Sequence, residues 1–317
     1  MSIQATRHNA SLDLSGKTAV IAGGTQGIGE GVAIRFAQLG ASRIFIVGRS
    51  EQSGNTVLQR LRDASAARSS SGAKQQFEFL RADLSSIKAI TEAANEIKQK
   101  VGSKGVDYLV MTQGGTPNGL YDENSDGLDK SFVVQCLSRF GLSYFLAESK
   151  TLNSGSSVVS VLSPGSDFSE LDIDDISLKK LHSTNPWRAS FLISQGKRDS
   201  MITDALTLEF NRRYPNINFY HLFPGFVTTS ILFNRGFPFP LPQLSSLLAP
   251  ILNKTIANSP SSYSDVPIFF AANPESKKFD GYFFNERLKK IEPSNKAKDP
   301  EMQQTIFQKF KGLLEYK

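Results

Sequence analysis

A cluster of glycines near the start of the chain has the spacing of an anion-binding turn. An apolar, strand-like run (Ala19–Ala22) leads into glycines at positions 23, 24, 27 and 29. An amphipathic, helix-like stretch follows as far as Leu39, and a second apolar run covers Ile44–Val47. We therefore expect a strand, a glycine turn, a helix and a second strand, in that order. The residues of this turn that would contact a bound anion are Gly23, Thr25, Gln26, Gly27, Ile28 and Gly29.

Each glycine of such a turn has a physical role when a dinucleotide pyrophosphate binds there. One permits the tight turn, another lets the backbone approach the phosphates, and a third lets the helix pack close to the strand. The helix would begin at about Gly27, so its unpaired N–H groups and the positive end of its dipole would face the anion. With strands and a helix flanking it in this order, the turn predicts a dinucleotide site rather than an ordinary loop.

The residue after the second strand indicates which dinucleotide would bind. An Asp or Glu there would accept a hydrogen bond from the ribose 2′-hydroxyl, whereas an arginine pairs with a 2′-phosphate. The sequence has Arg49 and Ser50 at this point, and no carboxylate before Glu51. Arg49 therefore favours NADP over NAD. Alternatively, Arg49 stacks on the adenine or faces solvent.

Composition and charge exclude several other kinds of protein or site. The chain has 317 residues, of which 39% are hydrophobic, so it can bury a large core. Its single cysteine, Cys136, excludes an internal disulfide, and its three histidines are too scattered to suggest a metal site. The net charge is +6, but basic residues in the tail alternate with acidic ones, so we expect no nucleic-acid partner. No apolar run is long enough to cross a bilayer, and we expect a cytoplasmic protein.

The chain alternates between strand-like and helix-like segments. This rhythm predicts an α/β fold with a doubly wound parallel sheet (a Rossmann fold) in a single domain over residues 15–285. We expect residues 1–14 to be a flexible leader, and residues 286–317 to be a charged link and a helix that docks on the body or on a partner subunit. Residues 231–258 follow the carboxyl end of a strand, where open α/β sheets bind ligands, and we interpret them as a substrate lid.

Several motifs, taken in order, resemble those of the short-chain dehydrogenase/reductase family over roughly residues 15–285. GGTQGIG at Gly23–Gly29 is similar to the family's TGxxxGxG turn, although Ala22 replaces the usual threonine. Asp83 resembles the aspartate that binds the adenine amino group, and PGFVTT at Pro224–Thr229 resembles the segment beside the nicotinamide. The resemblance implies an NADP-binding oxidoreductase that acts on a small-molecule substrate. The further cofactor contacts that it implies are Asp83, Gly114, Lys197, Pro224, Gly225, Val227 and Thr229.

The resemblance also implies a catalytic centre, and this chain departs from it. The family reduces carbonyls with a tyrosine as acid/base, a lysine four residues later, a serine that polarises the carbonyl and an asparagine on the preceding long helix. Ser163 and Lys197 match the serine and the lysine, but the tyrosine position falls on Ile193 and the asparagine position on Gln135. Isoleucine has no exchangeable proton, so the usual proton relay cannot run through Ile193.

Other groups could take over the missing role. Asp167, just past Ser163 in a Pro-Gly turn, would lie near the nicotinamide edge, although a loop or cap carboxylate is the alternative; water is another proton source. Arg139, one helical turn beyond Gln135, could bind a substrate carboxylate or phosphate, or form a surface salt bridge. Further groups that could occupy the tyrosine's place are Ser190, Ser194, Gln195 and His182.

These observations favour an NADP-dependent oxidoreductase that acts on a fairly apolar small molecule, by carbonyl or iminium reduction or by the reverse oxidation. The alternatives are a non-redox enzyme, such as a cyclase or isomerase in a specialised biosynthetic pathway, and a catalytically inactive NADP-binding protein. The family resemblance implies a homodimer or homotetramer built on the two long helices, at about residues 128–149 and 191–213.

Overall fold

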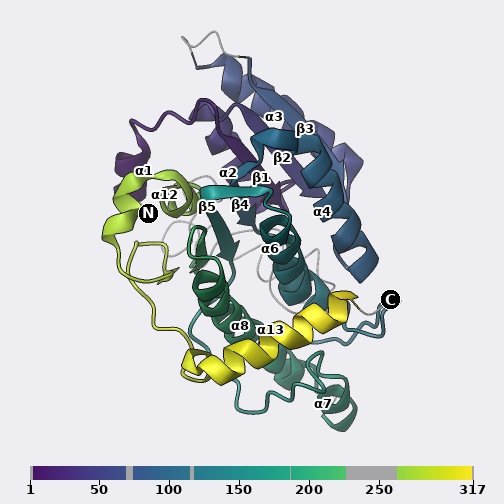
Figure 1. Cartoon of the computed structure of the whole chain (residues 1–317). Coiled ribbons are helices and arrows are strands. Elements are labelled where there is room, and N and C mark those ends of the chain that lie inside the picture. Colours follow the sequence, from purple (N-terminus) through teal and green to yellow (C-terminus); the bar gives the residue numbers. More distant parts are fainter. Residues whose placement is uncertain (1–2, 69–73, 115–117, 186, 226–262, 316–317) are drawn as a thin grey trace, which may run out of the picture.

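In the part of the chain that the structure describes, seven parallel strands form one sheet at the centre of the molecule (Figure 1). The computed structural model describes residues 3–68, 74–114, 118–185, 187–225 and 263–315. The strand order is β3-β2-β1-β4-β5-β6-β7, and every neighbouring pair is parallel, which confirms the predicted doubly wound sheet. The strands are β1 (Thr18–Ala22), β2 (Arg43–Gly48), β3 (Gln76–Arg81), β4 (Val106–Met111), β5 (Leu152–Val161), β6 (Asn218–Leu222) and β7 (Phe283–Phe284).

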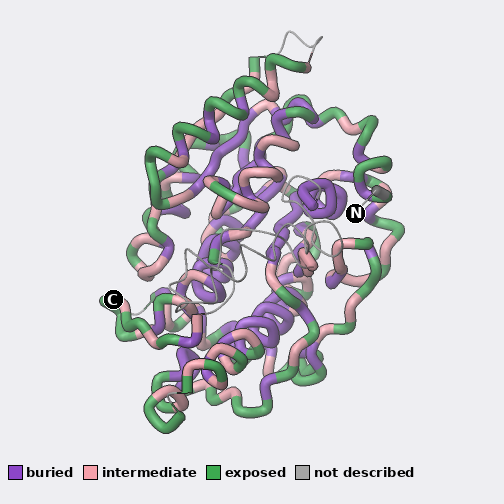
Figure 2. The backbone as a smooth tube through the Cα atoms, turned by 180° about the vertical axis from the view of Figure 1, so that it is seen from behind, coloured by how far each residue is buried: buried purple, intermediate pink, exposed green. Residues whose placement is uncertain are grey.

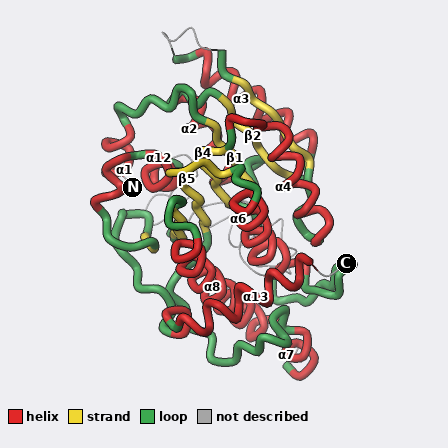
Figure 3. Tube along the Cα trace, viewed as in Figure 1, coloured by secondary structure: helices red, strands yellow, loops and turns green. Residues whose placement is uncertain are grey.

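Helices cover both faces of the sheet, as Figure 3 shows. Along β1, Ala19 and Ile21 belong to one hydrophobic core and Val20 to the other, because side chains alternate across a strand. Every residue of β1 is buried, which explains why the strand is a continuous apolar run in the sequence. The first core is covered by α1 (Ile3–Asn9), α2 (Gly27–Gln38), α3 (Glu51–Ala66) and α12 (Asp265–Ala272), and the second by α4 (Ile87–Val101), α6 (Ser138–Glu148), α8 (Arg188–Arg213) and α13 (Pro300–Glu315).

Short helical turns join these elements. α5 (Lys130–Phe132) continues through a π-helical turn, η2 (Val133–Leu137), into α6, and together they account for the long helix expected at residues 128–149. In Figure 2 the buried residues line the sheet, and the exposed ones lie on the outer sides of the helices. Within the described ranges, no helix is both long and apolar enough to cross a membrane. The other short helices of the described residues are η1 (Gly102–Lys104), α7 (Lys179–Thr184), η3 (Pro274–Lys278) and η4 (Lys296–Lys298).

The N-terminal segment is not the flexible leader that the sequence suggested. Residues 3–9 form helix α1, which packs on α12. The fully buried Asn9 donates from Nδ2 to the backbone oxygen of Asp265 at 2.8 Å, and Oγ1 of Thr6 donates to the Asp265 carboxylate at 2.8 Å. These partners lie more than 250 positions away in the chain, so no local pattern could have indicated them.

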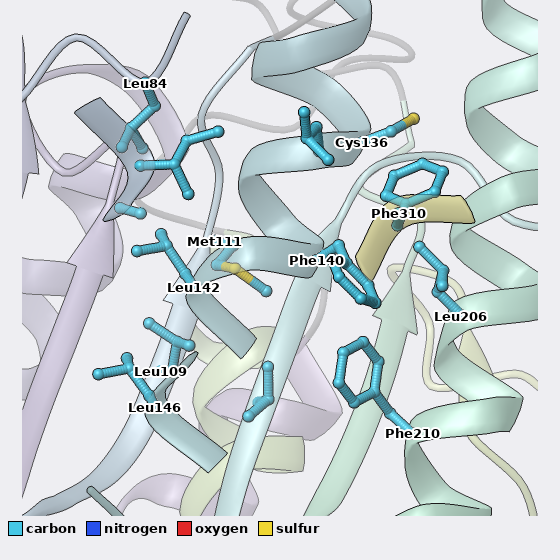
Figure 4. Packing of buried hydrophobic residues seen from close by; sticks show 14 of the residues in the cluster. Leu84, Leu109, Met111, Cys136, Phe140, Leu142, Leu146, Leu206, Phe210 and Phe310 are labelled. Atoms are coloured by element: carbon cyan, nitrogen blue, oxygen red, sulfur yellow. The ribbon is translucent and has the colours of Figure 1, made fainter. Parts of the chain in front are cut away.

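The C-terminal helix α13 docks on the body of the chain, which was one of the two surfaces expected for it. The rings of Phe307 and Phe310 pack edge-on against Phe140 of α6, with centroids 5.1 and 5.3 Å away. Phe210 of α8 lies 5.4 Å from Phe307, and the Arg213 guanidinium lies 4.1 Å from the centre of the Phe307 ring. Figure 4 shows Phe140, Phe210 and Phe310 in this cluster. The tail helix therefore covers the adjoining faces of α6 and α8.

Candidate functional site

The glycine turn after β1 is packed so tightly that only glycine fits at two of its positions. Gly23 has a φ of +80°, and a Cβ atom there would lie 2.6 Å from the backbone nitrogen of Gln113, beyond the end of β4. A Cβ atom on Gly29 would overlap the Gly23 carbonyl oxygen and Oγ1 of Thr112. The turn therefore lies directly against the ends of β1 and β4, and the first turn of α2 lies directly against the turn.

The N-terminus of α2 offers the donors that an anion needs. Gln26 at the N-cap is extended and exposed, and its side chain makes no capping hydrogen bond. Thr25, Gly27 and Ile28 beside it are half-buried, and Gly27 has a φ of +58°. The direction of the strand order reverses between β1 and β4, which is where open α/β sheets bind ligands. The turn can therefore hold a pyrophosphate on backbone N–H groups.

Arg49, Ser50 and Asp83 follow the ends of β2 and β3, and all three are exposed. Because β1, β2 and β3 pair in parallel, these residues lie at the same edge of the sheet as the glycine turn. Oγ of Ser50 accepts from the Ser53 backbone N–H at 3.2 Å and so caps α3. Arg49 is exposed and forms no ion pair with another residue of the described ranges.

Ser163, Gln135 and Gly114 lie at the carboxyl ends of β4 and β5. Ser163 is exposed, two residues after β5 ends. Gln135 is buried in the π-helical turn η2, and a Cβ atom on Gly114 would overlap its Oε1, so this side chain reaches the end of β4. Since β1, β4 and β5 are neighbours in a parallel sheet, these three residues share one edge with the glycine turn.

Lys197 and Ile193 lie one turn apart on α8, and both are exposed. The Ile193 side chain is 56% exposed, which is unusual for an isoleucine in a helix that packs on a sheet. The two side chains therefore lie on one exposed side of α8, its outer strip. The apolar Ile193 is at the position where the family resemblance implies a tyrosine.

Arg139 is neither a substrate ligand nor part of a surface salt bridge, which corrects both expectations for it. Its side chain is buried, and its guanidinium donates to the backbone oxygens of Gln135 at 2.7 Å, Gln113 at 2.9 Å and Val161 at 3.1 Å. Burial lowers the pKa of Arg139 to about 10, so it remains charged at neutral pH. Arg139 joins the ends of β4 and β5 to the turn that carries Gln135.

Asp167 does not face the nicotinamide edge as a proton donor. Its carboxylate accepts from the backbone N–H of Lys296 at 3.1 Å and from Nδ2 of Asn295 at 3.1 Å. Partial burial raises the pKa of Asp167, but these hydrogen bonds and one from Ser294 outweigh it and hold the pKa below its ordinary value. Asp167 is therefore ionised at neutral pH and holds the C-terminal segment, which was the alternative reading of this residue.

Most of the other groups considered for the tyrosine's place are already engaged. The buried Gln195 accepts from the Gly119 N–H at 3.1 Å and donates to the Leu120 carbonyl at 3.0 Å. The ring of His182 packs between Tyr121 and Phe191, with centroids 5.7 and 4.7 Å away. Oγ of Ser190 accepts from Nδ2 of Asn185 at 3.2 Å, whereas Ser194 is half-buried beside Ile193.

A buried ion pair that the sequence analysis missed ties α8 to the Gln135 turn. The fully buried Arg198 donates from Nη2 to Oδ1 of Asp199 at 2.7 Å, and its guanidinium lies 5.1 Å from the centre of the Phe132 ring. The Cys136 thiol donates to the same Asp199 oxygen at 3.3 Å. Burial raises the pKa of the Cys136 thiol well above its usual range, with Asp199 adding to the effect, so the reactive thiolate form is disfavoured. The sequence pattern gave no indication that Arg198 and Asp199, which follow Lys197, face the interior.

Two parts of the expected site lie outside the described residues. These are Val227 and Thr229 of the PGFVTT segment, and the lid expected at residues 231–258. Pro224 and Gly225 are described and follow the end of β6. Gly225 has a φ of +68°, and a Cβ atom there would lie 3.2 Å from Cδ of Glu286, so this turn also depends on glycine.

Comparisons with known proteins agree with this arrangement. The family model for short chain dehydrogenases matches residues 17–170. Oxidoreductase AN1596 of Emericella nidulans is 30% identical over 226 residues, which are 71% of this chain and 62% of that protein, so this chain spans less than two thirds of that relative. Retinol dehydrogenase 14 of Mus musculus is 25% identical over 86% of this chain and 78% of its own length. Among solved structures, the NADH-dependent reductase A1-R′ complexed with NAD is 18% identical and has a TM-score of 0.58, over 88% of this chain and 98% of that one.

A methyl group at the glycine turn should disturb dinucleotide binding. In Gly29→Ala the new Cβ would overlap the Gly23 carbonyl, so the turn or α2 must shift. We expect NADPH binding, measured by fluorescence titration, to weaken at least about tenfold, or about 1.4 kcal/mol. Gly312→Ala is the matched control, because a Cβ there meets nothing within 4 Å. Equal NADPH affinities for the two variants would contradict the position of the phosphate turn.

Asp167 should stabilise the protein in a pH-dependent way. Its pKa is lower in the folded protein than in the unfolded chain, so its contribution is complete above about pH 4 and is lost as the pH falls through the folded-state pKa. We expect Asp167→Asn to lower the free energy of unfolding at pH 7 by less than about 1 kcal/mol, because the group is mostly exposed. Urea unfolding at pH 7 and at about pH 3 measures the difference, with Glu170→Gln as control. A difference that grows in acid would contradict the contacts described.

Proposed function

This chain belongs to the short-chain dehydrogenase/reductase family, and on that premise we propose that it is an NADP-dependent oxidoreductase acting on a fairly apolar small molecule. The reaction is hydride transfer to a carbonyl or iminium carbon, or its reverse. The observation that carries the proposal is the single sheet edge shared by the glycine turn, Arg49 and Ser163, with Lys197 exposed on α8.

The residues at this edge fit an NADP molecule. The glycine turn packs closely against the ends of β1 and β4, so its backbone N–H groups are near the place where the pyrophosphate would lie, and Arg49 would pair with the 2′-phosphate. Lys197 would hold the nicotinamide ribose. When bound, the nicotinamide supplies or accepts the hydride. The preference for NADP over NAD rests on Arg49, since a reductase of the same fold is complexed with NAD.

The proton must come from a source other than the usual tyrosine. Ser163 would donate a hydrogen bond to the substrate oxygen, and water would deliver the proton, because Asp167 is bound to the C-terminal segment. A positioned general acid typically contributes about 10²–10⁴-fold, so its loss slows a carbonyl reduction without abolishing it. An iminium substrate needs no proton at this step, because it is already cationic.

Exposed apolar side chains support an apolar substrate. In the described part of the chain the large hydrophobic residues that are exposed are Leu120, Trp187 and Ile193. Trp187 is the N-cap residue of α8, Ile193 is on its outer strip, and Gln195 of the same helix binds the Leu120 backbone. Trp187 and Ile193 lie on the part of α8 that leads to Lys197, where a substrate would meet the cofactor.

Ile193 also supports a second candidate function. A family member without the acid/base tyrosine could keep NADP as a bound group and catalyse a non-redox step, such as a cyclisation or isomerisation. Consumption of NADPH during turnover separates the two functions.

The position of α13 bears on subunit assembly. A dimer built on the faces of α6 and α8 would have to displace Phe307 and Phe310 from their contacts with Phe140 and Phe210. We therefore propose that subunits of this protein do not pair through that face.

Arg49 should determine the cofactor preference. We expect the parent protein to bind NADPH at least about tenfold more tightly than NADH, equivalent to about 1.4 kcal/mol. Arg49→Ala should remove most of that difference, because the 2′-phosphate loses its cationic partner. Arg62→Ala, which removes an exposed arginine from α3, controls for the change in net charge. Equal affinities for the two dinucleotides in the parent protein would refute the preference for NADP.

Turnover tests the reaction itself. NADPH oxidation is measured with a panel of apolar ketones, aldehydes and cyclic imines. With a carbonyl substrate we expect Ser163→Ala to lower kcat by about 10²–10³-fold, the usual effect of removing one donor to a developing oxyanion. Ser169→Ala changes an exposed serine further along the chain and should leave kcat unaltered. Intact NADPH binding without oxidation of any member of the panel would favour the non-redox function.

A further inference from the structure

A buried aspartate–histidine pair lies behind Ser163 and has no place in the site described so far. His221 on β6 and Asp204 on α8 are both fully buried, and Nδ1 of His221 lies 2.8 Å from Oδ1 of Asp204. From the sequence, His221 reads as a packing residue of a buried strand. In the structure its ring connects Asp204 to the backbone of Ser163.

The hydrogen bonds determine which nitrogen of His221 carries the proton. The backbone N–H of Ser163 donates to Nε2 of His221 at 3.1 Å, so Nε2 is an acceptor and holds no proton. The proton is therefore on Nδ1, which donates to Asp204. A chain of two hydrogen bonds thus runs from the Asp204 carboxylate to the backbone of Ser163.

The same pair holds more of the Ser163 loop, which we define as residues 163–166. Oδ2 of Asp204 accepts from the Gly165 N–H at 2.9 Å and from the Ser294 N–H of the C-terminal segment at 2.8 Å. Oγ of Ser200 accepts from the Ser166 N–H at 3.0 Å. The one other residue of the loop, Pro164, has no N–H. Every backbone donor that the loop possesses is therefore bound by a side chain of α8 or β6.

These anchors belong to the helix that carries Lys197. Lys197, Ser200 and Asp204 are spaced three and four residues apart, so they follow one side of α8. Lys197 is exposed at the start of this row, whereas Ser200 and Asp204 are buried beneath the loop. Any shift of the loop relative to α8 would change the distance between Ser163 and Lys197.

We propose that the Asp204–His221 pair is a positioning device that holds Ser163 in register with Lys197. The pair acts through the loop backbone and does not touch substrate or cofactor. The proposal rests on the proposed function only for its effect on turnover. Its effect on the loop itself can be measured without a substrate.

Two substitutions of His221 differ in which of its hydrogen bonds they keep. The glutamine side chain in His221→Gln is long enough to place an acceptor near the position of Nε2, opposite the Ser163 N–H. The asparagine in His221→Asn reaches only as far as Nδ1 and keeps the contact with Asp204 alone. A role in mere core packing predicts similar effects for both variants, whereas a positioning role predicts rescue by glutamine.

The first measurement is amide hydrogen exchange with and without NADPH. We expect the Ser163 loop to exchange at least about tenfold faster in His221→Asn than in the parent protein, and nearly at the parent rate in His221→Gln. The glycine turn should exchange equally in all three proteins, and the NADPH dissociation constant should change by less than about threefold. Unchanged exchange of the loop in His221→Asn would overturn the proposal, whether or not any substrate is turned over.

The second measurement is turnover of a carbonyl substrate from the panel. We expect His221→Asn to lower kcat by about 10- to 100-fold with little change in NADPH affinity, since misplacement by about 1 Å can cost about 10²-fold. His221→Gln should recover most of the loss, and equal losses in both variants would overturn the proposal. If His221→Asn does not fold, Ser200→Ala, which releases only the Ser166 N–H, should loosen the loop to a smaller extent; an unaltered loop would count against the proposal. If the parent protein oxidises no NADPH, the proposed function fails, and the exchange data still decide the role of the pair.

Discussion

The edge of the sheet where the site lies depends on one buried guanidinium. Arg139 donates to the carbonyls of Gln113, Val161 and Gln135, which come from the end of β4, the end of β5 and the π-helical turn. These carbonyls lie at or near the points where the two strands and the regular helix end, and the Arg139 guanidinium gives all three a shared, charged donor. Burying the guanidinium costs free energy, and three charge-assisted hydrogen bonds offset that cost. One side chain thereby fixes the spacing between the strand ends.

The site divides into a half that keeps the family pattern and a half that departs from it. The glycine turn and Arg49 require only backbone geometry and one cation, and both are present. In the half that would carry the chemistry, we propose that Ile193 takes the tyrosine's place; the same helix, α8, is anchored by several buried polar groups, including the Arg198–Asp199 pair. Burying charges is costly unless they are paired; here Arg198 pairs with Asp199, which also accepts from the Cys136 thiol of the π-helical turn. Ile193 therefore lies on a helix that buried polar contacts connect to the π-helical turn.

Several features could be predicted from the sequence because they depend on local spacing. The apolar run of β1, the glycines that follow it and the helix after them form one continuous segment, and backbone geometry allows few alternatives to that order. The alternation of strands and helices then predicted a parallel sheet, since parallel strands need crossover connections. The exposed position of Arg49 after β2 follows from the same reasoning.

What the sequence alone determined is the sheet and the turn, and what only the tertiary structure decided is the set of partners of each polar side chain. Asp167 could be read as an acid or as a cap until the structure placed it against Lys296, 129 residues later in the chain. Arg139 and His221 are similar cases, because their partners come from strand ends that meet only after the sheet has formed. Helical or strand periodicity reports which side of an element faces inward. It does not report which distant atoms contact that side. The role and the charge of a polar group depend on its burial and its hydrogen-bond partners, which only the tertiary structure supplies.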